Sequence, residues 1–169
     1  SRSDADWKDV CIRIPGPETE KIGAFAQSHR VYVAGAAFER DPDWPEVWFT
    51  TGFIVGPSGE VELRYRKFHE HNVEGLIANV SPADVYSDYT SRYGEDSLFP
   101  VRNTPPGRRA VRVEHDMNFF ELARVLTFRG AEILLHPTAE WNGPMAQTLD
   151  QVRRSRAYEN FVYLASANA

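Results

Sequence analysis

Three short segments of this 169-residue sequence place ionisable side chains directly after runs that have the composition of buried strands. Lys67 follows one such run, Glu114, His115 and Asp116 follow a second, and His136 closes a third. Ligands of α/β proteins usually bind at strand ends, where side chains from several strands meet. We therefore take these three segments as the candidate site.

The first segment offers a cation. Residues 61–67 read VELRYRK, and strand alternation sends Tyr65 and Lys67 to one face and Arg64 and Arg66 to the other. A lysine held at a strand end can stabilise a developing negative charge or bind a carboxylate. A solvated basic strand end is the simpler interpretation of this segment taken alone.

The second segment has the pattern of a strand, a sharp turn and a helix. Residues 111–113 are strand-like, Glu114, His115 and Asp116 occupy the turn, and helical spacing begins at Phe119. Such an elbow exposes its turn residue beside a helix N-terminus, where backbone amides can hold an oxyanion. Alternatively, Asp116 simply caps the helix.

The third segment, residues 134–141 (LLHPTAEW), is a buried strand followed by a polar loop. His136 fits a hydrogen-bonded core histidine as well as a catalytic group, and Trp141 fits packing as well as substrate contact. None of the surrounding residues specifies a particular substrate. The side chains that we expect to line a substrate pocket are Tyr65, His115, Phe119, Trp141 and Asn142.

The elements that must position these segments alternate in type. Helices are expected from Pro17, with Ile22, Phe25 and Ala26 on its apolar face, from Pro82 to Gly94, at 119–128, and from Pro144 to about residue 160. A hairpin joins two of the strands, and crossovers join the last three, which predicts a mixed sheet in a layered α/β fold. No boundary divides the chain, so residues 1–169 are expected to form one domain. Strands are expected at residues 31–38, 47–55, 61–65, 110–113, 132–136 and 161–165.

Composition excludes several other classes of protein. Hydrophobic residues make up 42% of the chain, which is too high for disorder, and no apolar run reaches the roughly 20 residues of a membrane span. A net charge of −5 argues against nucleic acid or an anionic membrane as the main partner. The single cysteine, Cys11, cannot form an internal disulfide, and the N-terminus has no signal-peptide pattern. We therefore expect a cytoplasmic protein.

Several motifs, taken in order along residues 14–168, resemble those of the carbon–nitrogen hydrolase, or nitrilase, superfamily. The YRKFH run at 65–69 resembles the lysine motif of that family, and RGAEILLHP at 129–137 resembles the strand that follows its nucleophile helix. Many matches in order are more specific than any one alone. The remaining matches are VYVAG at 31–35, TPPGR at 104–108, FFELAR at 119–124 and RAYEN at 156–160.

The resemblance implies an α-β-β-α sandwich, here apparently incomplete at both ends. Family members hydrolyse small amides and nitriles without a cofactor or metal: a cysteine thiolate attacks, a glutamate acts as base, and a lysine stabilises the oxyanion. Lys67 takes the position of that lysine. The expected partners are therefore a small amide, nitrile or carboxylate and further copies of the chain, since the family commonly dimerises through the helices matching 119–128 and 145–160.

Several departures limit this expectation. Glu114 stands where the family has its nucleophilic cysteine, and Cys11 lies far from the elbow in the sequence. The segment that carries the general-base glutamate of the family has no counterpart in this sequence. A second active-site glutamate of the family should precede Gly94, where Asp88 is a nearby carboxylate with a loose match. A carboxylate lacks the reactivity of a thiolate, so we expect no amidase or nitrilase activity of this chain by the cysteine mechanism.

Two other hypotheses remain open. A non-catalytic relative would bind a small amide or carboxylate, or a partner chain, in the old pocket. A metal site would use Glu114, His115, Asp116 and His136, since carboxylates and imidazoles bind zinc and manganese. Neighbouring strand residues alternate faces, which disfavours the metal site, and residues 69–71 (HEH) share this weakness.

Overall fold

The structure is a computed structural model that describes residues 9–69, 80–140 and 143–169, and its strands form two sheets. The first sheet is antiparallel, in the order β1-β2-β3. The second is mixed, in the order β4-β5-β6-β7, with β4 antiparallel to β5 and the other neighbours parallel. The strands are β1 (Val33–Glu39), β2 (Phe49–Val55), β3 (Val61–Arg66), β4 (Arg102–Thr104), β5 (Gly107–Val111), β6 (Ile133–Thr138) and β7 (Tyr163–Asn168).

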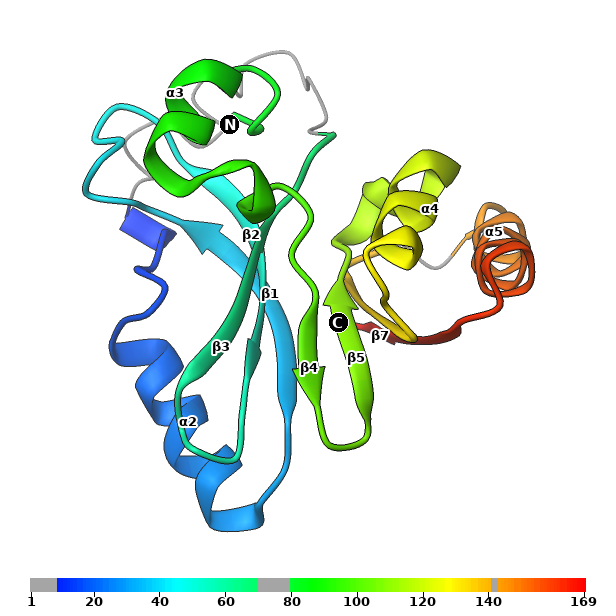
Figure 1. Ribbon diagram of the computed structural model, residues 1–169, viewed down its shortest axis with the longest axis horizontal. Coiled ribbons are helices and arrows are strands. Elements are labelled where there is room, and N and C mark those ends of the chain that lie inside the picture. Colours follow the sequence, from blue (N-terminus) through cyan, green and yellow to red (C-terminus); the bar gives the residue numbers. More distant parts are fainter. Residues whose placement is uncertain (1–8, 70–79, 141–142) are drawn as a thin grey trace.

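Helices cover the outer face of each sheet and complete four layers, with α2 on one side and α4 and α5 on the other (Figure 1). This α-β-β-α arrangement confirms the expected fold class. No helix of the described residues is long and apolar enough to cross a membrane. The helices are α2 (Pro17–His29), α3 (Tyr86–Tyr93), α4 (Phe120–Phe128) and α5 (Ala146–Asn160), with 3-10 turns η1 (Glu95–Ser97) and η2 (Glu114–Asn118).

Strand alternation builds the contact between the two sheets. Ile54 of β2 and Leu63 and Tyr65 of β3 pack against Val111 and Val113, which lie at and just beyond the end of β5. All five side chains are at most 5% exposed. Because Lys67 continues the alternation of Leu63 and Tyr65, it also faces the second sheet.

The opposite faces of the strands carry the helices. Phe53 and Val55 of β2 pack with Ala26 of α2 in a separate apolar cluster. In the second sheet, Ala110 of β5 and Leu134 of β6 pack with α4. The central strand β2 is therefore buried on both faces, whereas the edge strands β1 and β7 keep exposed positions.

The structure corrects four details. The hairpin strands β2 and β3 form a sheet of their own with β1, so the expected single mixed sheet is wrong. The helix expected from Pro82 begins only at Tyr86, because the Ser81 backbone N–H and hydroxyl both bond Asp84 in a tight turn. Phe25 is 54% exposed and does not join the apolar face of α2. The polar strand β4 has no apolar pattern to predict it, and it pairs with β5 through the backbone and through the Thr104 hydroxyl, which donates to the Gly107 carbonyl.

The two sheets approach each other closely at Gly52 of β2, which gives a test of the packing. A Cβ there would lie 2.4 Å from Val111 Cγ1 and 2.8 Å from Val113 Cγ2. We expect Gly52→Ala to lower the free energy of unfolding, measured in urea, by about 1–3 kcal/mol. Gly143→Ala, where a Cβ would meet nothing within 4 Å, is the control. Equal losses in the two variants would contradict this packing.

Candidate functional site

The two sheets bring together the lysine and the carboxylate that the sequence singles out. Lys67 is the first residue after β3, and Glu114 opens η2 just beyond β5. Lys67 Nζ lies 2.9 Å from Glu114 Oε2. The lysine side chain is 2% exposed and the glutamate side chain 36%. The site is therefore an ion pair with a buried cation and a carboxylate that reaches the surface.

Glu114 is the residue at which the chain turns sharply in the elbow. Its φ of 46° puts it in the left-handed region, which costs a residue with a side chain about 1–3 kcal/mol. The chain reverses there, between the end of a strand and the turns that lead into α4. This backbone conformation turns the carboxylate of Glu114 out of the strand and towards Lys67.

Asp116 joins the two halves of the site. Its carboxylate is fully buried and accepts hydrogen bonds from the Tyr65 hydroxyl at 2.5 Å and from the backbone N–H groups of Phe68 and His69 at 3.0 and 2.9 Å. These donors flank Lys67 on both sides. Burial and the charge of Asp116 raise the pKa of Tyr65 well above its usual value. Tyr65 therefore contributes to the site through its hydrogen bond to Asp116. Its expected contact with substrate stays a prediction.

Two arginine side chains stabilise the turn by hydrogen bonds to its backbone carbonyls. The backbone carbonyls of residues 116–119 all accept hydrogen bonds from guanidinium groups. Arg112 binds the first and last of them, and Arg156 of α5 binds the middle two at 3.2 and 3.0 Å. Burial lowers the pKa of Arg112 to about 10, which still leaves it charged at neutral pH.

His136 lies behind Glu114 on β6 and is 1% exposed. Its Nε2 is 3.0 Å from the Glu114 carbonyl oxygen, and its Nδ1 is 3.0 Å from Ser166 Oγ. Burial is the main cause that lowers the pKa of His136 to about 4, so its ring is neutral at physiological pH. Of the two interpretations that the sequence leaves open, this geometry favours the hydrogen-bonded core histidine.

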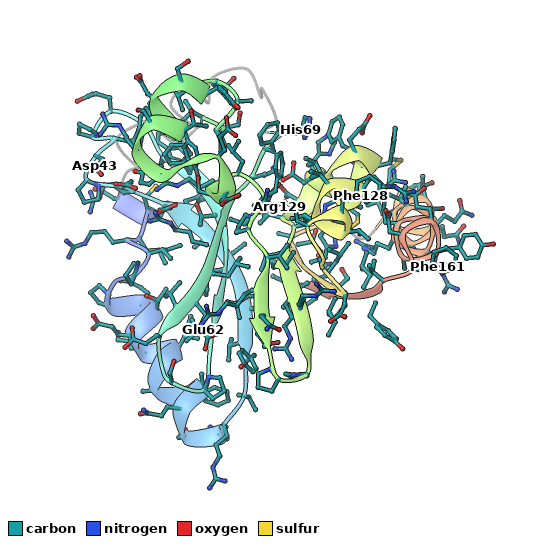
Figure 2. The ribbon with its side chains drawn as sticks, viewed as in Figure 1. Asp43, Glu62, His69, Phe128, Arg129 and Phe161 are labelled. Carbon is teal, nitrogen blue, oxygen red and sulfur yellow. The ribbon has the colours of Figure 1, made fainter. Side chains whose placement is uncertain are left out.

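A small pocket of about 320 Å³ opens beside the elbow. The rings of His69 and Phe119 stack at 3.7 Å between centroids, and His115 meets Phe119 edge-on at 5.6 Å. Figure 2 shows His69 between the α3 side of the molecule and α4. Most of the lining is apolar, which suits an uncharged group. The lining residues are Phe68, His69, Phe99, Phe119, Glu121, Leu122 and Val125.

The other predicted residues fall elsewhere. Trp141 and Asn142 lie outside the described residues. Asp88 is exposed in the first turn of α3. Cys11 is buried beside Ile12, which bridges to β1 in the first sheet, and burial raises the pKa of its thiol. Within the described ranges, no cluster of three or more His, Cys, Asp or Glu side chains could hold a metal ion.

The sequence reasoning missed the support of the turn. Arg112 and Arg156 were not expected to contribute, and Asp116 was expected to cap a helix or match a motif. One signal was available, because residues 110–113 read AVRV and an arginine in an otherwise apolar strand needs buried partners. The carbonyls that provide those partners become apparent only once the turn is built.

The four layers, the lysine at a strand end and the strained elbow are the features that the resemblance to carbon–nitrogen hydrolases implies. The family model for carbon–nitrogen hydrolases matches residues 3–169, and the chain therefore belongs to the carbon–nitrogen hydrolase family.

Individual relatives agree with this assignment. The human omega-amidase NIT2 is 30% identical over 96% of this chain and 56% of that enzyme. A carbon–nitrogen hydrolase from Helicobacter pylori G27 superposes with a TM-score of 0.78 at 19% identity, over 99% of this chain and 55% of that one. A variant amidase from Nesterenkonia sp. AN1, with acrylamide added at its active-site cysteine, superposes with a TM-score of 0.70 at 23% identity, over 89% and 53% of the two chains. The chain spans about half the length of these relatives.

The role of Asp116 can be tested by removing its charge. Asp116→Asn removes the charge and replaces one of two acceptor oxygens with a donor NH₂ group, which then faces the backbone N–H of Phe68 or of His69, so we expect the free energy of unfolding to fall by roughly 3 kcal/mol. Chemical denaturation measures this loss. Asp88→Asn changes an exposed carboxylate and should stay within about 0.5 kcal/mol of the parent. A loss at position 116 no larger than this control would show that Asp116 does not join the sheets.

Proposed function

We propose that this chain is a carbon–nitrogen hydrolase domain that does not hydrolyse amides through a cysteine thiolate. The observation that carries this proposal is the 2.9 Å ion pair between Glu114 and Lys67 at the elbow. By the family motif, the elbow residue is the nucleophile and the lysine stabilises the oxyanion. In this chain Lys67 takes the position of that lysine, and Glu114 takes the position of the nucleophile.

Simple chemistry supports this proposal. A carboxylate can act as a nucleophile towards glycosides and phosphates, but it is a poor one towards an unactivated amide. A lysine stabilises a transition state only if its charge meets a charge that develops during the reaction. The permanent carboxylate of Glu114 already faces the amine of Lys67. The pair therefore offers less to an oxyanion than a lysine beside a neutral thiol would.

The relatives indicate the chemical class of ligand. One relative is an omega-amidase, and the amidase from Nesterenkonia sp. AN1 holds an acrylamide adduct at its cysteine. We propose a small amide, nitrile or carboxylate as the ligand of the ancestral pocket, with no cofactor. The single cysteine of the sequence supports the cytoplasm as its location.

An ammonia assay tests the proposal. We expect the purified protein to release no ammonia above the buffer rate from a panel of short amides and nitriles, including formamide and acrylamide. Cys11→Ser excludes a contribution from the buried thiol. Ammonia release that disappears in Cys11→Ser would show hydrolysis through the thiol and would overturn the proposal. Release that persists in Cys11→Ser and disappears in Glu114→Ala would instead assign hydrolysis to the carboxylate.

A second candidate function is binding without turnover, and the pocket beside the elbow favours it. The stacked rings of His69 and Phe119 form one wall of this apolar space. Calorimetry with the same amides distinguishes the two candidates. Saturable heat without ammonia, weakened in Phe119→Ala, would support a binding protein. An absence of heat in both proteins would exclude it for that panel.

We further propose that copies of the chain associate through the side that carries α4 and α5. Large apolar side chains crowd this side, and Figure 2 shows Phe128 and Phe161 there, away from α2. Phe161 is 93% exposed and Tyr158 is 81% exposed. Exposed apolar groups gathered in this way usually mark an interface. The residues concerned are Phe120, Phe128, Met145, Tyr158 and Phe161.

Light scattering at micromolar concentration tests this association. We expect a species larger than one chain, and we expect Phe161→Asp to weaken it at least about tenfold in dissociation constant. An aspartate tolerates the left-handed backbone of position 161, so the fold should survive. Phe25→Asp on α2 is the control and should leave the association unchanged. A monomeric parent protein would contradict the proposal.

A further inference from the structure

The hydrogen bonds of His136 determine which of its nitrogens carries the proton. Nε2 faces the carbonyl oxygen of Glu114 at 3.0 Å, and a carbonyl can only accept, so Nε2 must donate. Nδ1 faces Arg153 Nε at 3.5 Å, and a guanidinium can only donate. Ser166 Oγ completes the surroundings of Nδ1 at 3.0 Å. The ring is therefore a neutral Nε2–H tautomer, in which its one proton points at the elbow.

We propose that His136 is a positioning residue that holds the left-handed backbone of Glu114, so that the carboxylate of Glu114 faces Lys67. The hydrogen bond reaches the one residue of the turn whose φ is unfavourable. Without that bond, the carbonyl of Glu114 loses its buried donor, and the peptide can relax towards a commoner conformation. This inference concerns what aims the carboxylate, and it stands whether or not the chain hydrolyses amides.

A chain of charged groups fixes the orientation of the ring. The guanidinium of Arg153 on α5 binds the carboxylate of Glu140 and points its Nε at His136. Glu140 is itself tied to Asn168 by two hydrogen bonds through its backbone, at 2.7 and 3.1 Å. The elbow is therefore connected through His136 to α5 and to the ends of β6 and β7.

Three substitutions separate positioning from simple packing. His136→Gln keeps an N–H donor that can reach the Glu114 carbonyl, whereas His136→Leu fills similar space without a donor. Ser166→Ala removes the hydroxyl beside Nδ1 and leaves the Nε2 bond in place. A purely structural histidine would respond to volume, so the glutamine and leucine variants would behave alike.

The readout is the ¹H–¹⁵N NMR signal of the Lys67 ammonium group, assigned by its loss in Lys67→Arg. An ammonium that is buried and ion-paired exchanges its protons slowly with water. We expect slow exchange in the parent protein, in His136→Gln and in Ser166→Ala, and roughly tenfold faster exchange or loss of the signal in His136→Leu. Exchange in His136→Leu within about twofold of the parent, or a glutamine variant that behaves like leucine, would overturn the proposal.

A measurement on the parent protein keeps the test decisive if His136→Leu does not fold. The ¹⁵N shifts of the His136 ring report its tautomer, and a coupling across the hydrogen bond reports the contact with the Glu114 carbonyl. A protonated Nε2 with this coupling supports the proposal. A ring protonated at Nδ1 alone, or an Nε2 proton without the coupling, contradicts it.

Discussion

The buried carboxylate of Asp116 is the contact on which the site depends. It lies in η2, beyond β5 of the second sheet, yet its donors are Tyr65 and the backbone of Phe68 and His69 at the end of the first. An ionised carboxylate without water is stable only when its lone pairs are filled, so these donors must be present for the fold to form. Because they flank Lys67, the same constraint fixes the lysine opposite the elbow.

Hydrogen bonds from two arginines and one neutral histidine to backbone carbonyls also stabilise the elbow. Arg112 and Arg156 occupy the carbonyls of residues 116–119, and His136 occupies the carbonyl of Glu114. These bonds offset the cost of a left-handed residue that carries a side chain. The arrangement thus holds the turn in a strained geometry, with the carboxylate of Glu114 on the residue whose φ is unfavourable.

If Glu114 takes the position of the family nucleophile, as we propose, that substitution changes the electrostatics of the site more than its shape. A thiol beside Lys67 would leave the ammonium available for a charge that develops in the reaction, whereas Glu114 supplies a permanent charge at 2.9 Å. Burial of the lysine strengthens the pair, because water screens it less. The contacts that stabilise the fold at this site are made by Asp116, Arg112, Arg156 and His136.

The sequence by itself predicted most of the helices and strands, though not β4, and singled out Lys67 and Glu114, because alternation along β3 and the family motifs both depend on local order. It did not locate the start of α3, where side-chain bonds between Ser81 and Asp84 replaced the first helical turn. Only the tertiary structure decided that Tyr65 supports the site from below, that two arginines and His136 hold the turn, and that a pocket opens beside Phe119. Each of these depends on groups distant in sequence that meet when two sheets stack, and no local pattern encodes the partner of a buried polar atom.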